Sequence, residues 1–388
     1  MGTRRSDATL RSPRGLAGST PGPWGTSEAP IAAHGRHLRQ LLRQRAMVAQ
    51  LRMGGGDSRP PVSFGGVVVV ALRTSPRYPT SMSHMKRVES PSQPGPAGMQ
   101  KPRSLLGRIA VIGGRGMLGS ALSDALRALG VQSAILDLPD FDVCRESDLA
   151  ETVRSSGVVI NCAAYTNVDR AEIEPELAHA VNAHAVGVLG RLAAEHGTVV
   201  LHVSTDFVFD GTLDRSYSER DEPCPLSVYG ASKLAGERSL AASGCASLVV
   251  RLQWTYGAGG ANFITKCVTR GRESRELRVV SDQIGSPTWT RDAAVALIDL
   301  LETGKTGLFH YAARGYAGRS EVAEFALRRL GVDCRVIPCR TDEFPTPARR
   351  PLNSRFNCDK VDEVLCAPRP TWQDSLSEFL DQTREGAI

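Results

Sequence analysis

The sequence predicts an α/β protein with a doubly wound parallel sheet, a smaller C-terminal part and a disordered N-terminal leader. From residue 108 onward, apolar runs typical of buried strands alternate with segments of helical periodicity. A glycine-rich turn follows the first apolar run. Residues 1–103, in contrast, are rich in Arg, Pro, Gly and Ser and show no pattern that would bury a core.

Charge separates this leader from the rest of the 388 residues. Residues 1–99 hold 14 Lys or Arg and four acids, a balance of +10, whereas the remaining residues have a balance of −4. We expect an over-called start of the reading frame; an organelle transit peptide and a basic arm for nucleic acid are the alternatives. The acidic balance of the body argues against a general nucleic-acid surface there.

Composition also narrows the class of protein. No run approaches the ~18 apolar residues of a membrane span, which excludes an integral membrane protein. The nine cysteines lack any Cys-x-x-Cys pair, so we expect free thiols in a reducing, cytoplasmic compartment. The eight histidines show no ligand spacing, and no protein-bound metal is expected.

The first predicted strand, 108–112, leads through the turn GGRGMLG into a helix with leucines on one face. Gly113, Gly116 and Gly119 give the spacing G-x-x-G-x-x-G. A strand that turns on glycine into a helix N-terminus provides room and backbone N–H donors for a pyrophosphate. The turn therefore predicts a Rossmann-type sheet that binds NADPH or NADH.

The next elements continue the alternation. A strand at 132–136 ends at Asp137, where an acid commonly binds the adenine ribose. Asn161 and the small residues after it end another strand, at the edge where such sheets bind ligands. The remaining predicted elements are a helix at 146–155, a strand at 158–164, a long helix at about 174–195 and a strand at 198–204.

Three residues predict the chemistry. Thr205 directly follows the strand at 198–204, and Tyr229 and Lys233 lie four residues apart on one face of a helix. A phenol has a pKa of about 10, which a neighbouring ammonium lowers, and a threonine hydroxyl can orient a carbonyl. We therefore expect Thr205, Tyr229 and Lys233 to be catalytic.

These residues resemble the extended short-chain dehydrogenase/reductase superfamily and, within it, the dTDP-4-dehydrorhamnose reductase family. The resemblance runs in family order from about residue 108 to 380. The segments that carry it are GGRGMLG, NCAAYTNVDRAEIEPELAHAVNA, HVSTDFVFDG, PLSVYGASKLAGE, RLQWTYG, NFI, SDQIGSPT and PTPARRPLNSRFN.

The resemblance implies NAD(P)H-dependent reduction of the 4-keto group of a dTDP-activated 6-deoxyhexose. Tyr229 would donate the proton, Lys233 would tune it and hold the nicotinamide ribose, and Thr205 would polarise the keto oxygen. Asn182 matches a helix residue that supports such sites. The implied cofactor residues are Gly113, Arg115, Gly116, Met117, Leu118, Gly119, Asp137, Asp142, Val143, Ala163, Ala164, Tyr229 and Lys233. The implied substrate residues are Asp206, Phe207, Trp254, Asn262, Phe263, Gln283, Pro287 and Arg350.

The expected division is a leader at 1–103, a NAD(P)-binding Rossmann domain at 104–255 and a mainly substrate-binding part at 256–388, with segments returning to the sheet. No nucleic acid or membrane partner is expected, and a homodimer is compatible with the family. Phe207 departs from the family pattern, because a Tyr is common at that position.

Several alternatives remain open. The same Tyr–Lys pair serves a reductase or epimerase of another nucleotide sugar, and a non-catalytic regulatory subunit like the methionine adenosyltransferase beta subunit looks similar. Trp254 can be a core aromatic residue, Arg350 a surface residue and Asn182 a helix bridge. Arg115 favours the 2′-phosphate of NADPH, whereas Asp137 would repel it.

Overall fold

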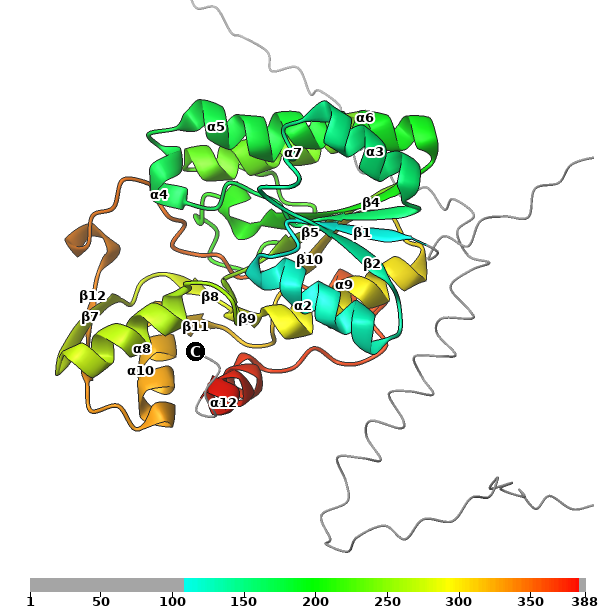
Figure 1. Cartoon of the computed structure of the whole chain (residues 1–388). Helices are drawn as coiled ribbons and strands as arrows, with labels where there is room; N and C mark the ends of the chain where they lie inside the picture. The colour runs from blue at the N-terminus through cyan, green and yellow to red at the C-terminus, as the bar shows by residue number, and fades with distance from the viewer. Residues whose placement is uncertain (1–107, 384–388) are drawn as a thin grey trace, which may run out of the picture. The chain divides into compact units, whose positions relative to one another are not determined.

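Residues 108–383 are described by a computed structural model, shown in Figure 1. The predictions for the leader at 1–103 lie outside these described residues. Six parallel strands form the central sheet in the spatial order β2-β1-β3-β4-β5-β10. Their bounds are β1 Ile109–Ile112, β2 Ser133–Leu136, β3 Val158–Asn161, β4 Val199–Thr205, β5 Ser247–Leu252 and β10 Gly307–Tyr311.

Burial explains the apolar runs of these strands. Every residue of β1, β3 and β5 is buried, because helices cover both faces of the sheet. The chain passes from β1 to β2 on one side and returns to β3 on the other, so the strand order reverses at β1. Ligands of such sheets bind outside the carboxyl ends of the strands at this point. The predicted doubly wound fold is confirmed.

The helices form a layer on each face of the sheet (Figure 1). On one face lie α3 Glu146–Ser155, α5 Pro175–His179, α6 Ala185–His196 and α7 Val228–Ala242. On the other lie α2 Met117–Ala128 and α9 Thr290–Thr303, which pack against each other. One apolar core lies between the sheet and each layer.

The long helix expected at 174–195 is interrupted. A π-helical turn at Ala180–His184 separates α5 from α6. Asn182 lies in this turn and is fully buried. Its side chain accepts a hydrogen bond from Tyr165 N at 2.8 Å and donates to Tyr165 O at 3.1 Å and to Ser232 Oγ at 2.9 Å. These bonds to two other segments hold the wider turn in place, and no periodicity within the helix could indicate them.

The smaller C-terminal part packs mainly around the parallel pair β7 and β12 and the helices α8, α10 and α12 (Figure 1). Its bounds are α8 Phe263–Glu273, β7 Glu276–Val280, α10 Arg319–Leu330, β12 Arg335–Cys339 and α12 Trp372–Gln382. The short elements are α4 Val168–Ala171, β6 Thr255–Tyr256, β8 Ile284–Gly285, β9 Thr288–Trp289, β11 Ala317–Gly318 and α11 Asp359–Asp362. Segments after residue 255, namely α9 and β10, pack on the large sheet.

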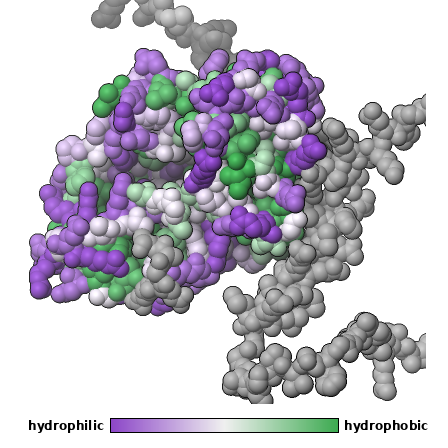
Figure 2. All heavy atoms as spheres, in the orientation of Figure 1, coloured by the Kyte–Doolittle hydropathy of each residue, from purple (hydrophilic) through white to green (hydrophobic). Residues whose placement is uncertain are grey.

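The face drawn in Figure 2 is mostly hydrophilic, with apolar side chains in small separate patches. None of the helices within residues 108–383 is long and apolar enough to cross a membrane. All nine cysteines lie in this range and are free thiols.

Candidate active site

A cleft of about 1120 Å³ opens at the carboxyl ends of the sheet strands and is closed on its other side by the C-terminal part. The three expected catalytic residues, Thr205, Tyr229 and Lys233, line it. All eight expected substrate residues line it as well: Asp206, Phe207, Trp254, Asn262, Phe263, Gln283, Pro287 and Arg350. Of the expected cofactor residues, Arg115 does not line the cleft.

The glycine turn has the shape of a cradle at the start of α2. Gly113 has a φ of +72°, and a Cβ there would lie 2.6 Å from Ala163 N at the end of β3. A Cβ on Gly119 would lie 2.2 Å from Gly113 O. Gly116 caps α2 and faces open space apart from Gly113 O at 3.3 Å. The turn therefore fits a dinucleotide pyrophosphate, which would meet the free N–H groups of α2.

Gly116→Val tests this cradle. A Cβ at Gly116 would lie 3.3 Å from Gly113 O, a tight contact that a small shift of the turn relieves. We therefore expect the variant to fold with a slightly lowered melting temperature, while its branched side chain fills the space that the phosphates need. The dissociation constant for NADPH, measured by fluorescence titration, should rise by about tenfold or more. Gly119→Ala is the contrasting variant, because its Cβ meets backbone and should destabilise the domain itself. Unchanged NADPH affinity in folded Gly116→Val would exclude the turn as the pyrophosphate site.

Asp137 and Arg115 are tied to each other at the end of β2. Arg115 N donates to Asp137 Oδ2 at 2.8 Å. The exposed Arg115 guanidinium donates to Leu138 O at 2.6 Å and to Asp140 at 3.0 Å. Arg115 therefore lies outside the cleft, with its charge engaged by Asp140.

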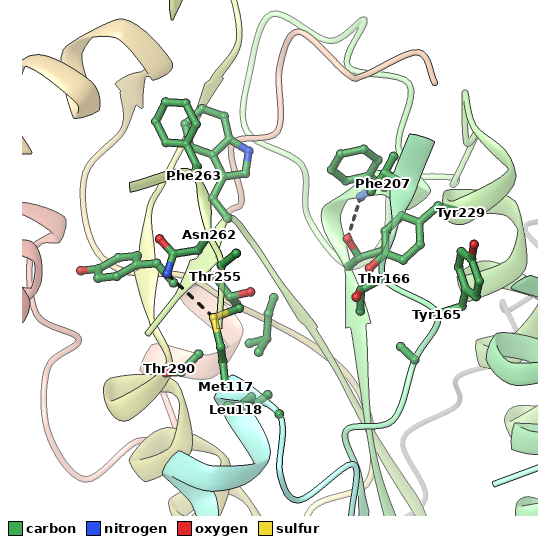
Figure 3. A pocket seen from close by; sticks show the side chains of 18 of the residues that line it. Met117, Leu118, Tyr165, Thr166, Phe207, Tyr229, Thr255, Asn262, Phe263 and Thr290 are labelled. Carbon is green, nitrogen blue, oxygen red and sulfur yellow. Dashed lines mark hydrogen bonds between the residues drawn. The ribbon is translucent and has the colours of Figure 1, made fainter. Parts of the chain in front are cut away.

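Thr205 ends β4 and caps the following turn. Its Oγ1 accepts a hydrogen bond from Phe207 N at 3.2 Å and donates to Asp206 Oδ1 at 3.1 Å. The Phe207 ring meets the Tyr229 ring edge to face, with centroids 5.5 Å apart. Tyr229 begins α7, which Ser227 caps by accepting a hydrogen bond from Gly230 N. Figure 3 shows Phe207, Tyr229 and Thr166 across the cleft from Met117 and Asn262.

The Lys233 ammonium is held by groups of β4. Its Nζ donates to Val203 O at 2.6 Å and lies 3.3 Å from His202 Nε2. Burial raises the pKa of Tyr229 to about 12, against a smaller lowering by the Thr205 hydroxyl, and the Asp206 carboxylate raises it further. A phenol with a raised pKa stays protonated at neutral pH, which suits a proton donor.

His202 contacts Lys233 from β4, a contact that the sequence interpretation missed. It is fully buried on β4, and burial and the Lys233 charge hold its pKa well below the ordinary value, so its imidazole is neutral. Asn161 Nδ2 lies 3.2 Å from His202 Nδ1, and Asn161 Oδ1 accepts from Ala163 N at 3.1 Å. A neutral imidazole has a single acceptor nitrogen, yet donors face both of its nitrogens. The tautomer of His202 is therefore coupled to the proton on Lys233.

Trp254 has a covered ring. Its φ is +45°, a left-handed conformation that is strained for a tryptophan and that packing must hold in place. The Arg319 guanidinium lies over the indole, 3.7 Å from the ring centroid, and Gly285 packs closely against the ring. Arg319 therefore lies next to the ring that was expected to contact the sugar. Arg319 was not among the site residues predicted from the sequence.

Two of the expected substrate residues, Asn262 and Arg350, form hydrogen bonds or ion pairs within the protein. Asn262 caps α8 by accepting from Thr265 N, and its Nδ2 donates to Gly257 O at 3.1 Å. Its amide also approaches Met117 Sδ at 3.9 Å, which joins the C-terminal part to the glycine turn (Figure 3). Arg350 pairs with Asp169 at 2.8 Å.

Asn182 contacts neither Tyr229 nor Lys233 through a hydrogen bond; its bonds go to Tyr165 and Ser232. It thus ties the π-helical turn to α7 through Ser232. No group of three or more His, Cys, Asp or Glu that could hold a metal ion occurs within residues 108–383.

A tyrosine and a lysine one helical turn apart, across a cleft from a glycine cradle on a parallel sheet, define the extended short-chain dehydrogenase/reductase class of oxidoreductases. Comparison with known proteins agrees. Residues 107–385 match the family described as RmlD substrate binding domain, and the chain belongs to this family.

Three relatives show the extent of the similarity. A dTDP-4-dehydrorhamnose reductase of Sinorhizobium fredii is 36% identical over 286 residues, covering 70% of this chain and 96% of that protein. One of Escherichia coli K12 is 35% identical, covering 71% of this chain and 97% of that protein. A crystal structure of the Bacillus anthracis dTDP-4-dehydrorhamnose reductase in complex with NADP matches with a TM-score of 0.69 at 32% identity, over 71% of this chain and 99% of that one.

Proposed function

We propose that this protein reduces the 4-keto group of dTDP-4-dehydro-L-rhamnose to give dTDP-L-rhamnose, with NADPH or NADH as the reductant. The single observation that carries the proposal is the convergence of Thr205, Tyr229 and Lys233 on one cleft with the glycine cradle. The identity of the substrate is inferred from the relatives. They are dTDP-4-dehydrorhamnose reductases, and the similarity covers nearly their whole length. The Bacillus anthracis complex with NADP supports the cofactor.

The roles follow from the positions of the side chains. The glycine turn and Lys233 would hold NADPH or NADH, which when bound would supply a hydride to C4 of the sugar. Tyr229, protonated at neutral pH, donates its proton to the keto oxygen, which the Thr205 hydroxyl orients. Lys233 binds the nicotinamide ribose, with its ammonium positioned by Val203 O and His202. The C-terminal part, which lines the opposite wall of the cleft, holds the thymidine diphosphate.

The test is an NADPH oxidation assay at 340 nm with enzymatically prepared dTDP-4-dehydro-L-rhamnose, followed by identification of the sugar product. Turnover that yields dTDP-L-rhamnose supports the proposal. Turnover only with a UDP- or GDP-linked keto sugar would indicate a different nucleotide-sugar reductase. NADPH binding without reduction of any of these sugars would favour the regulatory-subunit alternative.

A pH dependence tests the role of Lys233. Burial lowers its pKa to about 8, against raising effects of the Glu237 and Cys162 charges, and neutral His202 faces it from β4. The ammonium is therefore present below pH 8 and is lost as the pH rises through that value. A hydrogen bond to a charged group contributes about 1.5–3 kcal/mol, so NADPH affinity should fall roughly tenfold or more between pH 7 and pH 9.5.

The Lys233→Met variant is the control for this pH effect. It should bind NADPH weakly at pH 7 and show little further loss at pH 9.5, since the titrating group is gone. Tyr229, with its pKa near 12, stays protonated over this range and cannot cause the effect. An equal loss of affinity with pH in wild type and Lys233→Met would assign the effect to another group.

The proposal extends to the organisation of the chain. Residues 104–255 would bind the cofactor and residues 256–388 mainly the substrate, with α9 and β10 returning to the sheet. The free cysteines support a cytoplasmic location. Gel filtration with light scattering would test the homodimer that the family resemblance allows.

A further inference from the structure

Arg319 is an unusual residue in the wall of the cleft. It begins α10 in the C-terminal part, and its side chain reaches the cleft. Its guanidinium lies 3.7 Å from the Trp254 ring centroid and 4.8 Å from the Phe263 ring centroid. Two aromatic rings thus fix the plane of the guanidinium, which reduces the entropy that it would lose on binding a ligand.

The hydrogen-bonding groups of this guanidinium have no protein partner among the described residues. The backbone N–H of Arg319 donates to Gln283 O, but no side-chain hydrogen bond or ion pair joins its guanidinium to another residue of 108–383. A guanidinium carries five N–H donors, and leaving them unpaired in a partly buried site is costly. The N–H groups of the Arg319 guanidinium are therefore available to a ligand in the cleft.

The charges around Arg319 specify the kind of ligand. Arg350 is close enough for its charge to lower the pKa of Arg319, after the larger effect of burial. Lys266 and Arg270 of α8 line the same wall. An anion with charge on two adjacent groups would relieve the repulsion between these cations.

Within residues 108–383, no acid of the cleft forms an ion pair with Arg319. Asp169 is engaged by Arg350 at 2.8 Å. Asp206 attracts Arg319 through space, but the two form no ion pair within 4 Å, and burial raises the pKa of the Asp206 carboxyl. The positive charge of Arg319 therefore remains directed at the cleft.

We infer that Arg319 binds the diphosphate of the nucleotide sugar, presented by its stacking on Trp254 and Phe263. The inference rests on the proposed function and adds to it a residue that sets affinity for the diphosphate group. Trp254 then acts as a platform for the guanidinium, which accounts for the strained φ that keeps its ring at this place.

The experiment measures binding of dTDP, thymidine and NADPH separately by isothermal titration calorimetry. Arg319→Met keeps an unbranched side chain over the rings and removes the charge. We expect its dissociation constant for dTDP to rise by about 10- to 100-fold, while those for thymidine and NADPH change less than about threefold. Arg319→Lys keeps the charge without the planar fork and should recover part of the dTDP affinity.

Arg328→Met is the matched control, because Arg328 lies exposed on the same helix α10 and outside the cleft. It should leave all three affinities unchanged. The inference is overturned if folded Arg319→Met binds dTDP as wild type does. It is also overturned if the variant loses dTDP, thymidine and NADPH affinity equally together with thermal stability, which would indicate a structural role in packing the rings.

Failure of the proposed function gives a different result. If wild type binds UDP in preference to dTDP and Arg319→Met lowers that affinity, the diphosphate role stands and the thymidine-sugar substrate is wrong. If wild type reduces dTDP-4-dehydro-L-rhamnose and Arg319→Met leaves dTDP binding intact, only the role of Arg319 is wrong. If wild type binds neither dTDP nor UDP, both are wrong.

Discussion

Tyr229→Phe should lower kcat for the keto sugar by about 10²–10⁴-fold, equivalent to roughly 3–5 kcal/mol of barrier. The substitution removes the proton donor and keeps the ring. The edge-to-face contact with Phe207, at 5.5 Å between centroids, does not involve the hydroxyl. Folding and NADPH affinity should therefore survive, and the loss should fall on the chemical step. Single-turnover NADPH oxidation in a stopped-flow instrument measures that step directly.

Tyr165→Phe provides the matched control for this experiment. Tyr165 also lines the cleft, but its hydroxyl donates to Glu174 at 2.6 Å. Loss of this hydroxyl should leave kcat within a few-fold of wild type. If Tyr229→Phe is as fast as wild type, or if both variants lose the same activity, Tyr229 is not the proton donor.

Glu237→Gln should lower the free energy of unfolding by about 3–5 kcal/mol, because it leaves the charge of Arg251 buried without its counter-ion. Glu237 and Arg251 are 1% and 2% exposed and form a two-pronged pair at 2.7 and 2.9 Å. Ser204 also donates to Glu237. The group therefore joins α7, β5 and β4, the elements that carry Lys233 and Thr205. Urea denaturation followed by circular dichroism measures the change.

Two control variants distinguish the effect of burying the ion pair from the effect of removing any charge. Asp333→Asn breaks an exposed ion pair in which the Asp333 and Arg275 side chains are 95% and 90% exposed. This variant should leave the free energy of unfolding unchanged. The double variant Glu237→Gln/Arg251→Met removes both charges and should recover part of the loss. Equal effects of Glu237→Gln and Asp333→Asn would contradict the role of burial.

Local patterns in the sequence determined the architecture. Strands buried on both faces are largely apolar, so β1 and β3 were visible in the sequence, whereas β5, which carries the buried Arg251, was not predicted. Gly113 and Gly119 were visible because a Cβ at either position would meet backbone, that of Ala163 for Gly113 and that of Gly113 for Gly119. Tyr229 and Lys233 were visible because one helical turn places residues four apart on one face. Each of these signals depends on residues close together in the chain.

The tertiary structure decided which side chains act on each other. His202 meets Lys233 from a neighbouring strand, 31 residues away, and Arg251 meets Glu237 across the core. Arg319 meets Trp254 from the start of α10, 65 residues further along the chain. Stacking, ion pairs and hydrogen bonds require proximity in space and leave no periodic trace in the sequence. The partners of Lys233 and the presentation of Arg319 therefore depend on how the sheet, α7 and the C-terminal part pack.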